Sequence, residues 1–138
     1  ALCCQSSSLK SDHEPFFLRQ MNLAIKESQI EGRGVFATQA IEKGELIEVC
    51  PVIVLSERDR EKIARTILSE YYFSWDFDRA VIALGYSSIY NHSASPNATY
   101  DKHFEDRTIV YHCLRPIAQG EEITVAYHHG AWFPTNNP

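Results

Sequence analysis

The hydrophobic residues of this chain fall in short runs that are broken by Gly, Pro and Asn. Several of these runs are rich in Leu, Ile, Val and Tyr, and such runs of moderate length are typical of strands. The sequence predicts strands over residues 22–30, 45–55, 108–114 and 123–127, with a turn at 116–120. Pro51 lacks a backbone N–H, so we expect the 45–55 segment to be a pair of strands broken there.

One segment has helical periodicity. Ser56 followed three residues later by Asp59 is a capping signal at a helix N-terminus. Ile63, Ile67 and Tyr71 then recur at intervals of four residues, which places them on one helical face. The sequence therefore predicts a helix from this cap to about Tyr71. The expected fold class is mainly β with one or two short helices.

A chain of 138 residues is long enough for one domain with a buried core. Residues 1–15 are rich in Ser and end at Pro15, which predicts a disordered lead-in followed by a single domain over 16–138. No apolar run approaches the roughly 20 residues of a membrane-spanning helix, so we expect no membrane partner. Residues 1–4 are too short for a signal peptide, and the missing initiator Met indicates a trimmed or engineered start.

The composition, with 44% hydrophobic and 22% charged residues, is that of a soluble globular protein. Proteins that bind nucleic acid are usually basic, so the net charge of −5 argues against direct nucleic-acid binding. An acidic surface suits a basic partner such as a lysine-rich peptide, through long-range steering. A moderate negative charge also simply keeps a domain soluble, and both interpretations stay open.

The four cysteines show no Cys-x-x-Cys spacing, so we predict no zinc site. Cys50 and Cys113 lie in apolar, strand-like runs and are expected to be reduced core residues of an intracellular protein, nuclear or cytosolic. Cys3 and Cys4 receive no role. The adjacent histidines at 128–129 invite a metal hypothesis, but adjacent side chains on an extended chain point apart, so no metal is predicted.

Residues 91–97, Asn-His-Ser-Ala-Ser-Pro-Asn, form the most distinctive polar stretch. Asn and Ser side chains bond readily to nearby backbone groups, which predicts a tight, self-hydrogen-bonded loop. The stretch follows an apolar segment at 80–84, so a buried support presents exposed amide, imidazole and peptide groups, as binding sites often require. Downstream, residues 120–127, Gly-Glu-Glu-Ile-Thr-Val-Ala-Tyr, end a strand-like run with a tyrosine.

Together with Glu-Gly-Arg-Gly-Val-Phe at 31–36, these segments resemble the SET-domain protein lysine methyltransferases. The three segments correspond, in order, to the family's Gly-x-Gly, Asn-His-Ser-x-x-Pro-Asn and Glu-Glu-Ile/Leu-x-x-x-Tyr elements. The resemblance covers about residues 22–133 and is greatest to the small viral and bacterial SET proteins, which lack a cysteine-rich tail. It implies small curved sheets around a C-terminal pseudoknot, an arrangement that is rare among proteins.

The resemblance implies S-adenosylmethionine as the cofactor. Its binding residues would be Gly32, Arg33, Gly34, Asn91, His92 and Trp132. Glycines let the main chain approach a ligand closely, and an Asn amide offers both donors and acceptors to the head group. For each there is a structural alternative: a plain turn for the glycines, a turn-stabilising amide for Asn91, a satisfied structural histidine for His92, and ordinary core closure for Trp132.

Tyr127 is the catalytic residue that the resemblance implies, with its hydroxyl orienting the lysine amine. A tyrosine pKa of about 10 leaves the phenol protonated at neutral pH, so Tyr127 is no simple general base. Aromatic walls would pack the lysine stem, with Tyr71, Tyr90 and Tyr100 as candidates. Val125 stands where many members carry the aromatic residue that limits methyl number; either Tyr100 takes over this role or the site is roomy.

The implied function is methyl transfer from S-adenosylmethionine to a lysine side chain of a protein, with histone or histone-like tails as the leading substrate class. One alternative is a catalytically silent SET-fold module that binds a lysine-containing peptide or the cofactor. Another is an enzyme that acts on non-histone proteins. Small SET proteins can form homodimers, although this sequence shows no interface signature. The target lysine and the number of methyl groups stay undetermined.

Overall fold

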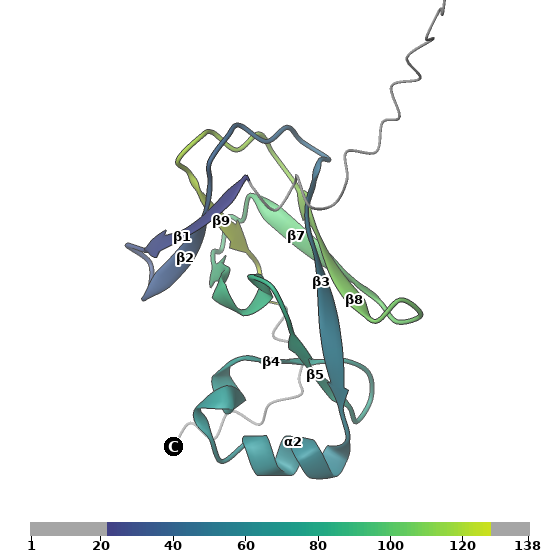
Figure 1. Ribbon diagram of the computed structural model, residues 1–138. Coiled ribbons are helices and arrows are strands. Elements are labelled where there is room, and N and C mark those ends of the chain that lie inside the picture. The colour runs from purple at the N-terminus through teal and green to yellow at the C-terminus, as the bar shows by residue number, and fades with distance from the viewer. Residues whose placement is uncertain (1–21, 128–138) are drawn as a thin grey trace, which may run out of the picture.

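The computed structural model describes residues 22–127 (Figure 1). Several sequence predictions lie outside the described residues: the lead-in at 1–15, Cys3, Cys4, the histidines at 128–129 and Trp132. No helix among the described residues is long and apolar enough to cross a bilayer.

The described chain is mainly β, as predicted from the short apolar runs. The strands are β1 (Leu23–Glu27), β2 (Arg33–Ala37), β3 (Leu46–Leu55), β4 (Tyr72–Ser74), β5 (Ala80–Ala83), β6 (Asn91–His92), β7 (Ala98–His103), β8 (Thr108–Cys113) and β9 (Glu122–Val125). The helical elements are α2 (Glu57–Ile63) and two 3₁₀ turns, η1 (Ile67–Glu70) and η2 (Ser87–Ile89). The sheet order is β1-β2-β9-β7-β8-β3-β5-β4, with β6 paired to β9.

Strand β3 is long enough to connect the strands around β8 with the β4–β5 pair (Figure 1). Its first part pairs with β8 and its last four residues pair with β5. The predicted break at Pro51 is wrong, because the strand continues through the proline as one element of ten residues. Pro51 lies where the strand changes partners. The carbonyl of Pro51 accepts from Leu84 N at 2.9 Å. Proline has no backbone N–H to donate, and the change of partner from β8 to β5 at this residue accommodates that missing donor.

The helix begins as predicted but ends early. Ser56 Oγ accepts from Asp59 N at 3.1 Å, yet α2 ends at Ile63 and a separate 3₁₀ turn follows, so the predicted single helix to Tyr71 is wrong. Thr66 causes the break: its hydroxyl donates to Ile63 O and accepts from Leu68 N, which replaces helical bonding with local bonding.

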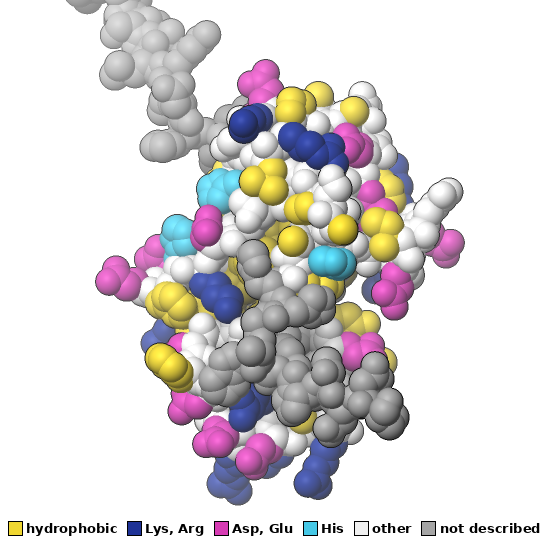
Figure 2. All heavy atoms as spheres, turned by 180° about the vertical axis from the view of Figure 1, so that it is seen from behind, with side chains coloured by type: hydrophobic (Ala, Val, Ile, Leu, Met, Phe, Trp, Pro, Cys, Tyr) yellow, Lys and Arg dark blue, Asp and Glu magenta, His cyan; other side chains and the backbone are white. Residues whose placement is uncertain are grey.

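The spacing of the apolar residues does not create a buried helical face here. Ile67 is 73% exposed and Tyr71 is 42% exposed, and no residue of α2 is buried. Figure 2 shows charged side chains of both signs gathered at the end of the molecule where α2 lies. The helix α2 therefore lies exposed to solvent at the end of the molecule that carries β4 and β5.

The core lies between the curved strands. Val35, Ile109 and Ile123 have no exposed surface, and they come from β2 near the start of the described residues and from β8 and β9 near their end. Cys50 and Cys113 are buried and free, which confirms the prediction that they are core residues. Burial raises the pKa of both thiols, so they stay protonated.

Strand β9 occupies the centre of the fold, although it is the last strand in sequence among residues 22–127. It lies between β2 and β7, antiparallel to β2 and parallel to both β6 and β7. Parallel neighbours cannot be joined by a hairpin, so the chain must leave the region and return.

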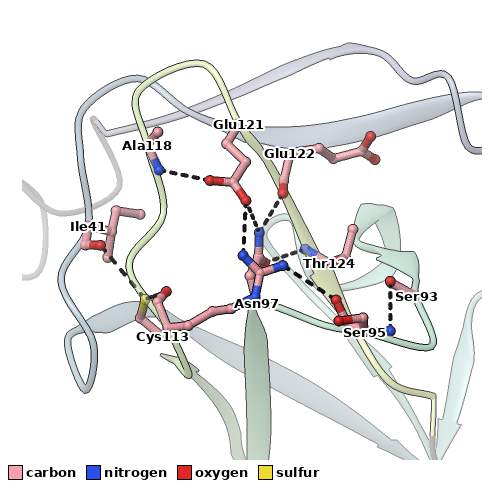
Figure 3. Close-up of polar contacts among 10 residues, drawn as sticks. Ile41, Ser93, Ser95, Asn97, Cys113, Ala118, Glu121, Glu122 and Thr124 are labelled. Atoms are coloured by element: carbon pink, nitrogen blue, oxygen red, sulfur yellow. Dashed lines mark hydrogen bonds and ion pairs between the residues drawn. The ribbon is translucent and has the colours of Figure 1, made fainter.

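The polar stretch at 91–97 is self-bonded as predicted, since Ser95 N donates to Ser93 Oγ at 3.1 Å. The expectation that all of its amides are exposed is wrong for Asn97, which is 1% exposed. Figure 3 shows how its side chain grips β9: Nδ2 donates to Glu122 O at 2.8 Å, and Oδ1 accepts from Thr124 N at 2.8 Å. Asn97 thus ties the loop to the central strand.

Asn97→Ala is expected to lower the free energy of unfolding by at least about 2 kcal/mol, because each buried group left without a partner costs about 1–3 kcal/mol. Urea unfolding followed by circular dichroism measures the change. Ser95→Ala, in the exposed part of the same loop, is the control and should change stability by less than about 0.5 kcal/mol. Equal effects of the two substitutions would contradict the role given to Asn97.

Candidate active site

Three segments that are distant in sequence meet at β9. Its residue Ile123 pairs with Val35 of β2, and its residue Thr124 pairs with Asn91 of β6. The chain that follows β9 then runs directly past His92 to Tyr127. The Gly-x-Gly turn, the Asn91–His92 pair and Tyr127 therefore all lie around β9. Figure 1 shows the position of this strand between β2 and β7.

The amide of Asn91 connects the first two of these segments. Its Nδ2 donates to the carbonyl oxygens of Glu31 and Arg33, at 3.1 Å and 3.2 Å, and to Glu122 Oε1 at 2.8 Å. The backbone of the Gly-x-Gly turn is thereby held against β6. Arg33 contributes its carbonyl to this contact, while the residue itself is exposed.

The two glycines serve different needs. Gly32 has φ +49°, a left-handed conformation that favours glycine, and an added Cβ there would meet nothing within 4 Å. An added Cβ on Gly34 would lie 2.1 Å from Glu122 Oε1 and 3.2 Å from Asn91 Nδ2. Gly34 therefore makes room for two side chains of the protein itself, which the sequence did not indicate.

Tyr127 is held at both ends by the Asn-His segment. Its backbone N donates to His92 Nδ1 at 3.0 Å, and its phenol donates to the main-chain oxygen of Tyr90. The rings of His92 and Tyr127 lie 5.3 Å apart. The imidazole thus has a definite structural task, because it accepts the backbone N–H of Tyr127.

The environment of Tyr127 keeps its phenol protonated. Burial is the largest cause that raises its pKa, and the nearby Tyr100 phenol and Glu31 carboxylate raise it further. The ring of Tyr100 makes an edge contact with Phe73, with centroids 6.3 Å apart, and Phe73 is an aromatic neighbour that the sequence did not single out.

Tyr90 lies in the core. It has no exposed surface, its ring stacks on Tyr111 with centroids 4.5 Å apart, and its hydroxyl donates to Glu48 Oε2 at 2.8 Å. The other oxygen of the buried Glu48 accepts from Tyr86 N at 3.0 Å. Tyr90 therefore contributes its carbonyl oxygen to the site, and the hydrogen bond from its hydroxyl to Glu48 holds its ring in the core.

The remaining candidates are placed less directly. Tyr71 follows η1, is partly exposed, and its carbonyl accepts from Ser88 Oγ at 3.0 Å, which tethers it near the Asn-His segment. Val125 is buried in β9 and pairs with His92. Glu122 bonds both Asn91 and Ser28, but its run of two glutamates gave no sign of which one faces the site.

The comparisons with known proteins agree with this arrangement. The SET domain family model matches residues 32–128. The chain is 35% identical over 112 residues to an H3 lysine-37 specific histone-lysine N-methyltransferase of Schizosaccharomyces pombe, covering 80% of this chain and 76% of that protein. It is also 30% identical over 120 residues to an H3 lysine-4 specific histone-lysine N-methyltransferase of Cryptococcus neoformans.

A second long relative is the histone-lysine N-methyltransferase trithorax of Drosophila virilis, 32% identical over 116 residues. These alignments cover 80% and 76% of this chain, but only 8% of the Cryptococcus protein and 3% of the Drosophila protein.

A solved structure from Plasmodium falciparum, described as a candidate histone methyltransferase, superposes with a TM-score of 0.66 at 28% identity, covering 81% of this chain and 97% of that one. The family model spans most of the described residues, and the matched segment carries the Gly-x-Gly turn, the Asn-His pair and Tyr127. This chain therefore belongs to the SET domain family.

Proposed function

We propose that this chain is an S-adenosylmethionine-dependent protein-lysine N-methyltransferase that acts on histone tails. The observation that carries the proposal is the convergence on β9 of the Gly-x-Gly turn, the Asn91–His92 pair and Tyr127. The relatives named as histone-lysine N-methyltransferases support both the reaction and the substrate class. A histone substrate implies a nuclear place of action.

The residues of the site fit the cofactor. When bound, S-adenosylmethionine supplies an electrophilic methyl group on a positively charged sulfur. Asn91 would hold the amino acid head through its carbonyl Oδ1, because its Nδ2 is already used by protein acceptors. The turn at Gly32 is open, and the main chain of residues 91–92 would contact the adenine. Trp132, outside the described residues, would cover the adenine.

Tyr127 would orient the lysine amine. Its O–H donates to the Tyr90 carbonyl, so the lone pairs of the phenol oxygen are left to accept an N–H of the substrate. With its raised pKa the phenol cannot serve as the base, and the amine must lose its proton to water before transfer. Rate acceleration would then come mainly from holding nitrogen, carbon and sulfur in line.

The walls of the lysine channel would come from Tyr100, Phe73 and Tyr71. Tyr100 is the strongest candidate, because its phenol influences Tyr127 and its ring packs against Phe73 and Tyr111. Aromatic faces favour the methylated ammonium products. Val125 stands where many members of the family carry an aromatic residue that limits the number of methyl groups. Its smaller side chain would permit more than one methyl group.

Asn91→Ala is expected to weaken cofactor binding about tenfold or more, because a hydrogen bond to a charged group contributes about 1.5–3 kcal/mol. Isothermal titration with S-adenosylmethionine and with S-adenosylhomocysteine measures the dissociation constants. Binding of neither compound by the wild-type protein would sink the proposed function. Binding without transfer of labelled methyl to mixed histones or to a cell lysate would favour the silent binding module.

Tyr127→Phe is expected to lower kcat by about 100-fold, since small misplacement of reacting groups has costs of that size, while cofactor affinity stays nearly unchanged. Radiolabelled methyl transfer to a histone H3 peptide at saturating cofactor gives kcat, and titration gives the affinity. Tyr72→Phe removes a phenol to which no role is assigned and is the control. Full activity of the Tyr127→Phe protein would overturn the catalytic assignment.

The pH dependence should follow the substrate amine and not the tyrosine. Because burial raises the pKa of Tyr127 above its usual value of about 10, the phenol stays mainly protonated up to about pH 9.5, while the deprotonated fraction of the substrate amine rises with pH. Single-turnover rates are therefore expected to rise with pH up to about 9.5 without a decline. A fall in rate between about pH 8 and 9.5, with the protein still folded by circular dichroism, would contradict this environment for Tyr127.

A further inference from the structure

We propose that Glu122 and Ser28 are positioning residues that fix the orientation of the Asn91 amide, so that its carbonyl oxygen alone faces the cofactor. The inference rests on the proposed function and deepens it, because it assigns the selectivity of the site for an ammonium group to two residues that do not themselves contact the ligand.

The carboxylate of Glu122 is the centre of this cluster. Its Oε1 accepts from Asn91 Nδ2 at 2.8 Å and from Ser28 Oγ at 2.9 Å, and its Oε2 accepts from Ser28 Oγ at 2.8 Å. The Ser28 contacts join residues 94 positions apart in sequence, the Asn91 contact joins residues 31 apart, and all of them are partly buried. An ionised carboxylate can only accept hydrogen bonds, so it admits the nitrogen of the amide and rejects the oxygen.

An asparagine side chain has two nearly isosteric orientations, and the surrounding acceptors choose between them. Nδ2 of Asn91 faces three acceptors: Glu122 Oε1 and the carbonyls of Glu31 and Arg33. The flipped amide would place Oδ1 against three oxygens. The observed orientation leaves Oδ1 as the hydrogen-bonding atom of Asn91 that can receive a ligand, and Oδ1 can only accept.

Ser28 and Gly34 both help to hold the Glu122 carboxylate beside Asn91. Ser28 is held by its own backbone, since its N donates to Gly32 O at 2.8 Å and its Oγ accepts from Ile30 N at 2.9 Å. Gly34 lacks the Cβ that would lie 2.1 Å from Glu122 Oε1. The Gly-x-Gly turn therefore supplies the seat of the carboxylate as well as the carbonyls that face the amide.

The consequence is a donor-selective subsite. A ligand that approaches Oδ1 must bring a hydrogen-bond donor, as the ammonium of an amino acid head does. A ligand that lacks this ammonium gains nothing from Asn91, so the selectivity between the two should depend on the amide orientation and hence on Glu122.

The test compares two ligands across variants by isothermal titration. The ligands are S-adenosylhomocysteine and its analogue without the amino group. The wild-type protein is expected to prefer the first by about tenfold or more, as a charge-assisted hydrogen bond would give. Glu122→Met keeps the length of the side chain but removes one of the three acceptors that face Nδ2, so it should reduce this preference several-fold.

Two further variants separate positioning from simple structure. Glu122→Gln retains one carbonyl oxygen toward Asn91 while Ser28 Oγ can accept from its amide, so it should keep most of the preference. Glu121→Gln is the matched control, because Glu121 is the adjacent carboxylate and bonds Asn97, Arg115 and Ala118 N instead (Figure 3). It should leave the preference unchanged.

The outcomes distinguish this inference from the proposed function. A wild-type protein that binds neither ligand removes the proposed function itself. A Glu122→Met protein that retains the wild-type preference overturns the positioning role and leaves the proposed function standing. Equal loss of affinity for both ligands in Glu122→Met, together with a lower melting temperature, would show a purely structural role and would also overturn it.

Discussion

The pairing of β9 with β2, β6 and β7 is the contact on which the site depends. Each of the three pairings joins segments far apart in sequence, and two of them are parallel. None can form until the intervening chain has folded, so we expect the site to be assembled late, with the closure of long loops. The binding and catalytic residues acquire their geometry together, because all of them are placed by one four-residue strand.

In and near the site, polar side chains join distant segments by hydrogen bonds, whereas elsewhere in the core apolar packing joins them. Asn97, Glu122 and Glu48 each bond to backbone or side-chain groups of distant segments, and among residues 22–127 no buried side-chain nitrogen or oxygen lacks a partner. Apolar contacts tolerate small slips in register, whereas a hydrogen bond is lost within about an ångström. Such a network specifies one arrangement of the strands, which an active site requires.

The sequence predicted the elements with strong local signals. Short β-branched runs located β8 and β9, and Ser56 located the start of α2, because these features depend on neighbouring residues. It missed β7, whose alternation is interrupted by Asp101 and Lys102, and it extended the helix too far because the hydroxyl of Thr66 competes with helical bonding. The motif residues were found through family resemblance, whereas Glu48, Ser28 and the separate role of Glu122 within its motif emerged only from contacts across the fold.

The phenol of Tyr127 is anchored to a main-chain oxygen, and its backbone N is anchored to an imidazole. Every amino acid carries the oxygen that Tyr90 contributes, so replacing that side chain does not by itself delete the anchor. The side chain at position 90 can therefore change, provided that it fills the interior beside Tyr111 and leaves the main chain in place, because the partner of the Tyr127 phenol is a backbone group.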